Sequence, residues 1–457
     1  LITLFLYWEL MAIVSTVVIW CGANPRARAA GIRYALLHLL GGVVLKVGIE
    51  GITVHTKSID LQPMLATDFD TWMLLIGILI NAATPPLAAW LSDAYPASTP
   101  TGSVFLSAFT TKTAVLALLL LFPGEPVLIG IGLAMALYGI VYALLESDGR
   151  RLLAYTIVNQ VGIMVCAVGL GTPQALNGAA ALAVVNIVVM GLLFMTAGAV
   201  VYRTGGRNGG APGGLVGAMP VTALCAVIGG LAISGVPLFA GFAAFPMLLE
   251  AASGSGRAVV YFLLLLTAVG VWLHAGLRYP WLVFFRTRTG PAPQGASEEA
   301  PWNMRLAMVL FAALSVGVGV YPDLLYRHLP YAVGDGPYSA GNVIFTLEVL
   351  GFAGLAFVLA RRFVPYSTKV HLDADWLWRV AFKRLAGVGT TALTACAAAG
   401  ARALGATAGP LARLRQRLFG PGTEDGSRGT FARSWPIGTT ALWIAVLLSG
   451  YVLAYYF

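Results

Sequence analysis

Three charged side chains lie in the middle of long apolar runs of the chain: Glu9, Lys46 and Lys112. A charge at the centre of a bilayer costs from about 3 to well over 10 kcal/mol, so each one needs a partner or a purpose. At about 1.5 Å per residue, all three would lie roughly 16 to 21 Å from the inner ends of their helices. Groups of opposite charge at one depth could relay protons or form a structural ion pair. Glu50 and Glu348 could instead reach an interface or a neighbouring protein.

Two apolar segments are interrupted in a similar way. The first contains Pro85 and Pro86, and the second contains Gly235, Pro237 and Pro246. Proline lacks a backbone donor and frees a carbonyl, which lipid cannot satisfy but a buried polar path can. Paired interruptions in the two halves of a bundle indicate an inverted-repeat transporter with a path near the midplane. Ordinary helix kinks are the alternative interpretation.

The composition indicates that a membrane surrounds these residues. Of 457 residues, 58% are hydrophobic and 10% are charged, against roughly a quarter charged in soluble domains. This excludes soluble enzymes and nucleic-acid-binding proteins. A helix needs about 20 apolar residues to span the bilayer, and about twelve such segments can be counted. They cover approximately residues 1–21, 31–54, 71–92, 101–122, 126–145, 151–171, 175–203, 219–250, 257–279, 303–322, 340–360 and 435–457.

Arginines in alternate connections set the expected orientation. Arg26, Arg150, Arg203 and Arg286 stand in every second connection, and basic residues in short loops stay in the cytoplasm. The first helix would therefore run inward. The expected parts of the chain are a first part of the membrane bundle at 1–171, a second part at 175–360, a basic cytoplasmic segment with an amphipathic helix at 361–434, and a last transmembrane helix at 435–457.

The basic segment carries most of the positive charge of the chain. Its arginines could meet anionic lipid headgroups or a partner protein, or the segment could be an ordinary positive-inside connection. Cofactor chemistry has no support, because the cysteines and histidines are dispersed and no nucleotide-binding loop follows a strand. We therefore expect no metal, no cofactor and no catalytic site of the chain's own. The chain begins with Leu1 inside an apolar run, so we expect a segment upstream of it.

Four stretches of the sequence resemble one known family. They are NAATPPLAAWLSDAYPASTPTGSVFLSAFTTKTAVLAL at 81–118, YWELM at 7–11, ESDGRRLLAY at 146–155 and SGVPLFAGF at 234–242. The chain resembles the MrpD-type family of membrane subunits from Mrp-type multisubunit cation/proton antiporters, which is related to the antiporter-like membrane subunits of respiratory complex I. The resemblance covers essentially residues 1–362. It implies an all-α polytopic membrane protein, with an antiporter-like helix bundle, an inverted repeat and two broken helices, whose first four helices are missing here.

The resemblance also implies roles for individual residues. In the family, a helix-borne Glu and a row of Lys and His near the midplane pass protons across the bundle. Glu9 matches the Glu, Lys112 matches the Lys that follows the first broken helix, and Asn81 stands where that broken helix usually has Lys. Lys46 is then expected to be the basic partner of Glu9. The family has titratable residues where this chain has Ala88, Thr156, Leu182, Asn186, Met190 and Phe245.

Two functions are compatible with this pattern. The first is a membrane subunit of a multisubunit monovalent cation (Na⁺)/proton antiporter, or of a complex I-like and redox-driven ion translocase, with a partly degenerate proton path. Because Leu, Met and Phe cannot bind protons, the second half is expected to hold few ordered waters. The second function is a non-transporting structural or coupling spacer of the same fold. In both cases we expect other membrane subunits as partners, in a bacterial inner membrane.

Overall fold

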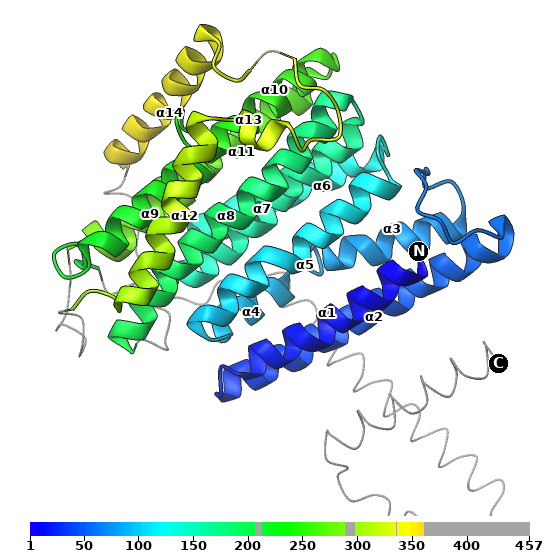
Figure 1. The fold of residues 1–457 in the computed structure, drawn as a ribbon, viewed down its shortest axis with the longest axis horizontal. Coiled ribbons are helices and arrows are strands. Elements are labelled where there is room, and N and C mark those ends of the chain that lie inside the picture. The colour runs from blue at the N-terminus through cyan, green and yellow to red at the C-terminus, as the bar shows by residue number, and fades with distance from the viewer. Residues whose placement is uncertain (206–212, 288–297, 335, 361–457) are drawn as a thin grey trace, which may run out of the picture. The chain divides into compact units, whose positions relative to one another are not determined.

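The computed structural model describes residues 1–205, 213–287, 298–334 and 336–360. This part of the chain consists of helices joined by short connections (Figure 1). Nine of its helices are long and apolar enough to cross a membrane, and two apolar helices are shorter. The expected segments at 361–434 and 435–457 lie outside the described residues. Every other predicted segment contains a helix, so the polytopic all-α fold is confirmed.

The helices follow one another in a single series. The first seven are α1 (Ile2–Trp20), α2 (Pro25–Thr56), α3 (Phe69–Asn81), α4 (Ala89–Ala97), α5 (Pro100–Leu121), α6 (Val127–Leu145) and α7 (Gly149–Leu170). The next are α8 (Pro173–Thr204), α9 (Pro220–Ile233), the 3₁₀ turn η1 (Ala240–Ala243), α10 (Phe245–Gly254) and α11 (Ala258–Val271). After α11 come the π-helical turns η2 (Trp272–Arg278) and η3 (Trp281–Phe285), then α12 (Trp302–Val320), α13 (Asp323–Tyr326) and α14 (Ala340–Ala360).

Local sequence signals set the starts of several long helices. Asn24, Thr99 and Thr172 each precede a proline, and each side chain accepts a hydrogen bond from the backbone N–H three residues later. A polar cap satisfies a free donor, and proline suits the first helical position because its missing N–H has no partner there. The Asn-Pro, Thr-Pro and Thr-Pro pairs therefore fix where α2, α5 and α8 begin.

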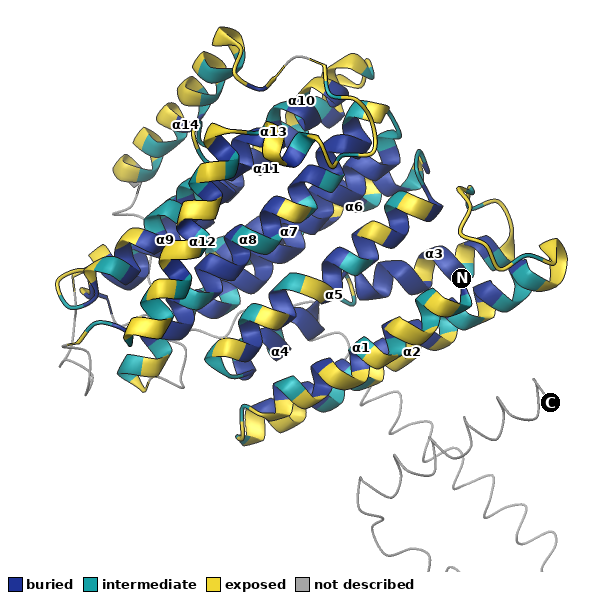
Figure 2. Ribbon diagram, viewed as in Figure 1, coloured by how far each residue is buried: buried dark blue, intermediate teal, exposed yellow. Residues whose placement is uncertain are grey.

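Helices α7 and α8 form the buried centre, whereas α1 and α14 are exposed along much of their length (Figure 2). Glycines allow α7 to pack closely against α6. A Cβ added at Gly139 would lie 2.5 Å from the backbone nitrogen of Asn159, and one at Gly162 would lie 2.5 Å from that of Ala136. Backbone contact of this kind is typical of helix packing in membranes.

The exposed faces of the flanking helices are apolar. On α1 they include Leu6, Leu10 and Ile13, and on α14 they include Phe352 and Leu359. Exposed apolar surface of this extent on a helix requires lipid or another membrane helix as its neighbour.

The two broken helices end in the same local structure. In the first, the N–H of Thr84 donates to Leu79 O and the N–H of Ala83 donates to Ile80 O. In the second, the N–H of Val236 donates to Leu231 O and that of Gly235 to Ala232 O. These paired bonds define a Schellman motif, which terminates a helix with one left-handed residue.

The left-handed residues and the prolines occupy equivalent positions in the two motifs. Ala83 has φ 62° and Gly235 has φ 72°, and each stands two residues before a proline, Pro85 or Pro237. Since proline cannot continue the hydrogen-bond ladder, α3 and α9 both end rather than kink. The prediction of two broken helices is therefore confirmed. Four long helices separate them, so they cross in opposite directions, as an inverted repeat requires.

One end of the bundle, called the basic end here, brings together the starts of α5 and α7 and the end of α4. Nη2 of Arg150 donates to the carbonyl oxygens of Tyr95 at 3.0 Å, Ser98 at 3.0 Å and Thr99 at 3.3 Å. The last carbonyls of a helix have no partner within the helix, so a buried guanidinium beside them stabilises that end. Arg150 thus fastens the end of the first broken helix to the central helix α7.

A carboxylate has the complementary role at the start of α9. Oε2 of Glu299 accepts a hydrogen bond from the backbone N–H of Val221 at 2.8 Å, and Oε1 accepts from the Thr222 hydroxyl at 2.6 Å. The positive pole of a helix N-terminus favours such an anion. Nε of Arg203 at the end of α8 donates to the Glu299 carbonyl at 2.7 Å, so this connection also joins three elements.

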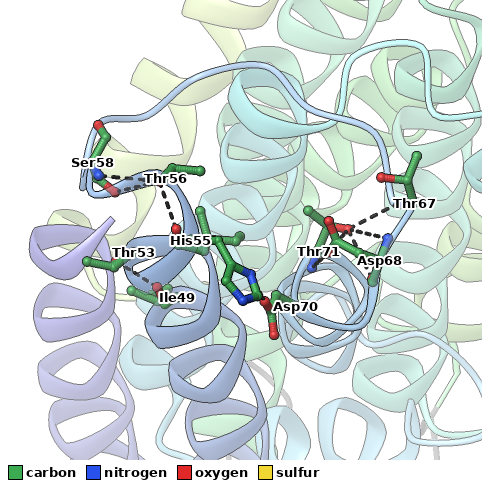
Figure 3. A network of polar contacts seen from close by, with 10 residues as sticks. Ile49, Thr53, His55, Thr56, Ser58, Thr67, Asp68, Asp70 and Thr71 are labelled. Atoms are coloured by element: carbon green, nitrogen blue, oxygen red, sulfur yellow. Dashed lines mark hydrogen bonds and ion pairs between the residues drawn. The ribbon is translucent and has the colours of Figure 1, made fainter.

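The opposite end carries a polar network between α2 and α3 (Figure 3). Nδ1 of His55 lies 2.9 Å from Oδ2 of Asp70. Asp68 accepts a 2.9 Å hydrogen bond from the backbone N–H of Thr71, and the Thr71 hydroxyl oxygen accepts one from the Asp68 N–H at 3.2 Å. This reciprocal arrangement is a capping box, which fixes the first turn of α3.

Replacing Asp68 by Ala is expected to destabilise the first turn of α3 by about 1 kcal/mol. The hydrogen bond from the Thr71 N–H is the main cause of the lowered pKa of Asp68. A lowered carboxyl pKa stabilises the folded state at higher pH, and this contribution is lost as the pH falls through the folded value. Amide hydrogen exchange of residues 69–73 should therefore be faster in the variant at neutral pH, with a difference that shrinks below about pH 4. Equal exchange at neutral pH would contradict the cap.

Candidate functional site

The candidate site lies where α1, α2, α5 and the first broken helix meet. A Cβ added at Gly42 would overlap Oε1 of Glu9, and one added at Gly41 would lie 3.0 Å from Nδ2 of Asn81. Two adjacent glycines of α2 thus provide the space for a carboxylate from α1 and a carboxamide from α3. Within the described residues, Glu9 has no hydrogen-bond or ion-pair partner.

Asn81 is the last residue of α3, directly before the first break. Its Nδ2 donates to Gly77 O at 3.0 Å, whereas its buried Oδ1 has no partner among the described residues. Beyond the break, Nε1 of Trp90 donates to Ile80 O at 3.3 Å. Ile80 O also accepts the N–H of Ala83, so this second bond ties the helix after the break to the end of α3. Nδ2 of Asn81 is therefore fixed by a hydrogen bond, whereas Oδ1 could accept one from a further donor.

Lys112 lies inside the bundle, with 6% of its surface exposed. Its Nζ donates to the carbonyl oxygen of Ser107 at 2.8 Å, and it has no ion pair within the described residues. One carbonyl satisfies only one of the three donors of an ammonium group. Buried and without a counterion, Lys112 is the kind of intramembrane residue for which function is the default interpretation.

The expected ion pair between Glu9 and Lys46 is wrong. Nζ of Lys46 lies 2.9 Å from Oε1 of Glu50, four residues further along α2, and 5.8 Å from the centre of the Phe5 ring. The predicted depth of Lys46 in the membrane was wrong, because α2 begins at Pro25 rather than at residue 31. This places Lys46 about 9 Å further from the basic end than expected. Glu50, rather than Glu9, is therefore the ion-pair partner of Lys46.

In the second half, three positions at which the family has titratable residues share one buried face of α8. Leu182, Asn186 and Met190 are spaced four residues apart on α8 and are at most 1% exposed, so they share a side of the helix. Leu182 and Met190 have no group that binds a proton. Asn186 differs, because neither Nδ2 nor Oδ1 has a partner among the described residues.

The packing of α5 against α8 gives the level of Asn186. A Cβ at Gly198 would lie 3.1 Å from Pro100, and one at Gly191 would lie 4.0 Å from Val104. The two helices are therefore antiparallel, and continuing this register along them puts Asn186 near the level of the α5 turn that ends at Lys112. Since buried polar groups usually have partners, we expect a water molecule to bind this amide. The expected dryness stays a prediction for Leu182 and Met190.

A cavity of about 230 Å³ reaches the second break. Phe245 lines it together with Ser234 and Gly235, and Glu250 and Asn342 lie among its polar walls. Phe245 is thus not enclosed by apolar side chains alone. This cavity gives the second half a hydratable space beside the break, which the apolar sequence of that half did not indicate.

Comparison with known proteins gives the family of the chain. The family described as "NADH:quinone oxidoreductase/Mrp antiporter, TM" matches residues 1–271. The chain belongs to this family. The match covers α1 to α11, including Glu9, Lys112 and both broken helices, so the resemblance to antiporter-like membrane subunits is confirmed.

Relatives in this antiporter family come from distant organisms. The chain is 26% identical to an Na⁺/H⁺ antiporter subunit of Alkalihalophilus pseudofirmus, over 75% of this chain and 49% of that protein. It is 27% identical to hydrogenase-4 component B of Escherichia coli, over 82% of this chain and 63% of that protein. The chain therefore spans between about half and two thirds of the length of these two relatives.

Solved structures of antiporter-like subunits share the fold. A chain of the Mrp complex from Dietzia sp. DQ12-45-1b has a TM-score of 0.64 at 21% identity, covering 79% of this chain and 74% of that one. A chain of respiratory complex I from Thermus thermophilus has a TM-score of 0.58 at 24% identity, covering 70% and 73%. At these identities the likeness shows the shared fold alone.

Two buried histidines of this family member lie outside the residues that the sequence assigned to the path. His38 of α2 lies one turn before Gly41 and Gly42, and its i, i+3, i+4 spacing to them could have placed it beside Glu9 and Asn81. His274 lies in η2, and its Nδ1 is 3.2 Å from the hydroxyl of Thr156. A titratable side chain, which the resemblance implies at position 156, is thus present beside Thr156 but comes from another helix. No short-range pattern links residues 156 and 274.

Proposed function

We propose that the chain is a membrane subunit of a multisubunit monovalent cation (Na⁺)/proton antiporter or of a complex I-like, redox-driven ion-translocating assembly. Its partners would be other membrane subunits, in a bacterial inner membrane, with the basic segment at 361–434 against anionic lipid. The observation that carries the proposal is the buried Lys112, which has no counterion among the described residues. A purely structural lysine would be expected to have one.

The first half supplies the ion path in this proposal. Glu9 and Asn81 lie on adjacent glycines of α2, at the break of α3, and Lys112 follows on α5. A carboxylate and an amine can exchange a proton through intervening polar groups or water, whereas Asn81 can only hydrogen-bond. In this proposal Lys46 takes part together with Glu50, with which it forms an ion pair on α2.

The proposal is tested by Glu9→Gln in the complete complex. The amide keeps the size and the polarity of the side chain but cannot carry a proton, so cation-dependent proton flux into vesicles should fall by about tenfold or more. Subunit content, measured in the same vesicles, should not change. Asp323→Asn removes an exposed charge outside the site and serves as the control.

The structural spacer is the second candidate, and one observation favours it. Leu182 and Met190 are buried and cannot bind a proton, so the second half is a partly degenerate path. In that case the chain would hold or couple its neighbours without conducting. Normal flux of the Glu9→Gln complex at normal subunit content would favour the spacer over the ion path.

A further inference from the structure

His38 is a titratable side chain of α2 that is buried beside Trp90 of α4, and the path described above does not use it. It is 2% exposed. Its Nδ1 lies 3.0 Å from the carbonyl oxygen of Tyr34, one turn earlier on α2. A carbonyl oxygen only accepts hydrogen bonds, so Nδ1 carries the proton of this bond. In the neutral ring, Nε2 is then an acceptor.

Aromatic contacts fix the plane of the His38 ring. It stacks on Tyr34 at 3.8 Å between centroids and 19° between planes, and it meets the Trp90 ring edge-on at 4.6 Å. Trp90 follows the first break, and its Nε1 is bonded to Ile80 O. The direction in which Nε2 points is therefore set by neighbours on two helices.

Among the buried polar atoms of this region that have no partner in the described residues, three come from α2, α3 and α5. They are Nε2 of His38, Oδ1 of Asn81 and Oγ1 of Thr111, respectively. All three side chains are at least 98% buried. Such groups are usually satisfied in folded proteins, and a bound water needs two to four polar partners.

The contacts of α2 around His38 lead toward Glu9 and Asn81 on one side and toward the turn of α5 before Lys112 on the other. On one side, His38 shares a face of α2 with Gly41 and Gly42, on which Asn81 and Glu9 lie. On the other side, the hydroxyl of Tyr34 lies 3.3 Å from Oγ1 of Thr110. Thr110 directly precedes Thr111 and Lys112 on α5.

We propose that His38 is a proton-relay residue that connects Glu9 to Lys112 through water held by His38 Nε2, Asn81 and Thr111. This inference rests on the proposed function. The O–H bond of protonated Glu9 breaks and, through water, an N–H bond forms at Nε2. That N–H bond then breaks, and through water a proton is added to the neutral amine of Lys112. Because Tyr34 O holds the Nδ1 proton, the proton arrives and leaves at the same atom, and the ring need not turn.

The test uses two variants of the complete complex. His38→Asn can keep the hydrogen bond to Tyr34 O, and His38→Gln keeps a polar group near the Nε2 position, but neither titrates. Proton flux should fall by about tenfold or more in both, with unchanged subunit content. His328→Gln, at an exposed histidine, is the matched control. Full flux in either variant would assign His38 a structural role and overturn the relay.

The same vesicles separate this inference from the proposed function. If Lys112→Met lowers flux while both His38 variants conduct normally, the relay through His38 is wrong and the ion path stands. If Lys112→Met also conducts normally, the proposed function fails as well. A structure of the unmodified complex with ordered waters gives a measurement that does not depend on folding of the variants. Water within hydrogen-bond distance of His38 Nε2 is expected there, and its absence would overturn the proposal.

Discussion

Lys112→Met should lower cation-dependent proton flux of the complete complex by about tenfold or more while leaving assembly unchanged. Lys112 makes one described hydrogen bond, to the Ser107 carbonyl, and no ion pair. Met has a similar length and remains apolar in a buried position, so the substitution removes the charge and largely keeps the packing. Removing a buried, uncompensated charge does not orphan a counterion, so stability should not fall. Flux and subunit content are measured in the same vesicles.

The control for Lys112→Met is Ser107→Ala on the same helix. It keeps the carbonyl that Lys112 uses and removes only the hydroxyl, which bonds to Val104 O. We expect near-normal flux from this variant. Normal flux from Lys112→Met at normal subunit content would reject an ionic role for Lys112 and leave the structural spacer as the better account.

Arg150→Met should have the largest effect on stability, about 3 kcal/mol or more. The substitution takes the donor from the carbonyls of Tyr95, Ser98 and Thr99 at the end of α4. These carbonyl groups lie in a buried region, where water does not readily replace the lost guanidinium donor. The measurement is the fraction of complex that stays intact through a series of temperatures. The variant should dissociate or aggregate several degrees below the unmodified complex.

The neighbouring arginine provides the matched control. Nε of Arg151 lies 3.1 Å from Oε2 of Glu146, and its side chain is 34% exposed. A partly exposed pair of this kind contributes about 1 kcal/mol or less. Arg151→Met should therefore shift the transition much less than Arg150→Met. Equal shifts would show that a positive charge at this end matters, rather than the fastening of α4 to α7.

Most of the fold could be predicted from the sequence, because the length of the apolar runs and the lipid around them determine where helices form. Lipid requires every backbone group to be satisfied within the segment, so apolar runs of about 20 residues predict helices reliably. The breaks at Pro85 and Pro237 were predictable because proline ends the hydrogen-bond ladder. The Schellman geometry itself was not, since Ala83 is not a residue whose type indicates a left-handed conformation.

The site was less predictable because it depends on which residues face one another. The depth of Glu9 and Lys112 could be counted from helix ends, but Lys46 was misplaced by a helix start that lies at Pro25. The contacts of His38 with Trp90 and of His274 with Thr156 could not be predicted, because these neighbours come from other helices at separations that no local pattern records. Asn186 appeared as a lost titratable residue, and its importance as an unpaired buried amide required the packed structure.

The two breaks also fix an electric field inside the bundle. The C-terminus of a half-helix carries a partial charge of about −0.5 and the N-terminus of the next about +0.5. The end of α3 and the start of α4 are therefore poles of opposite sign on the two sides of the first break, as are the end of α9 and the start of α10 at the second. Because the two broken helices cross in opposite directions, their fields point in opposite senses along the membrane normal. Side-chain replacement in the second half removes titratable groups, but it leaves this backbone field in place.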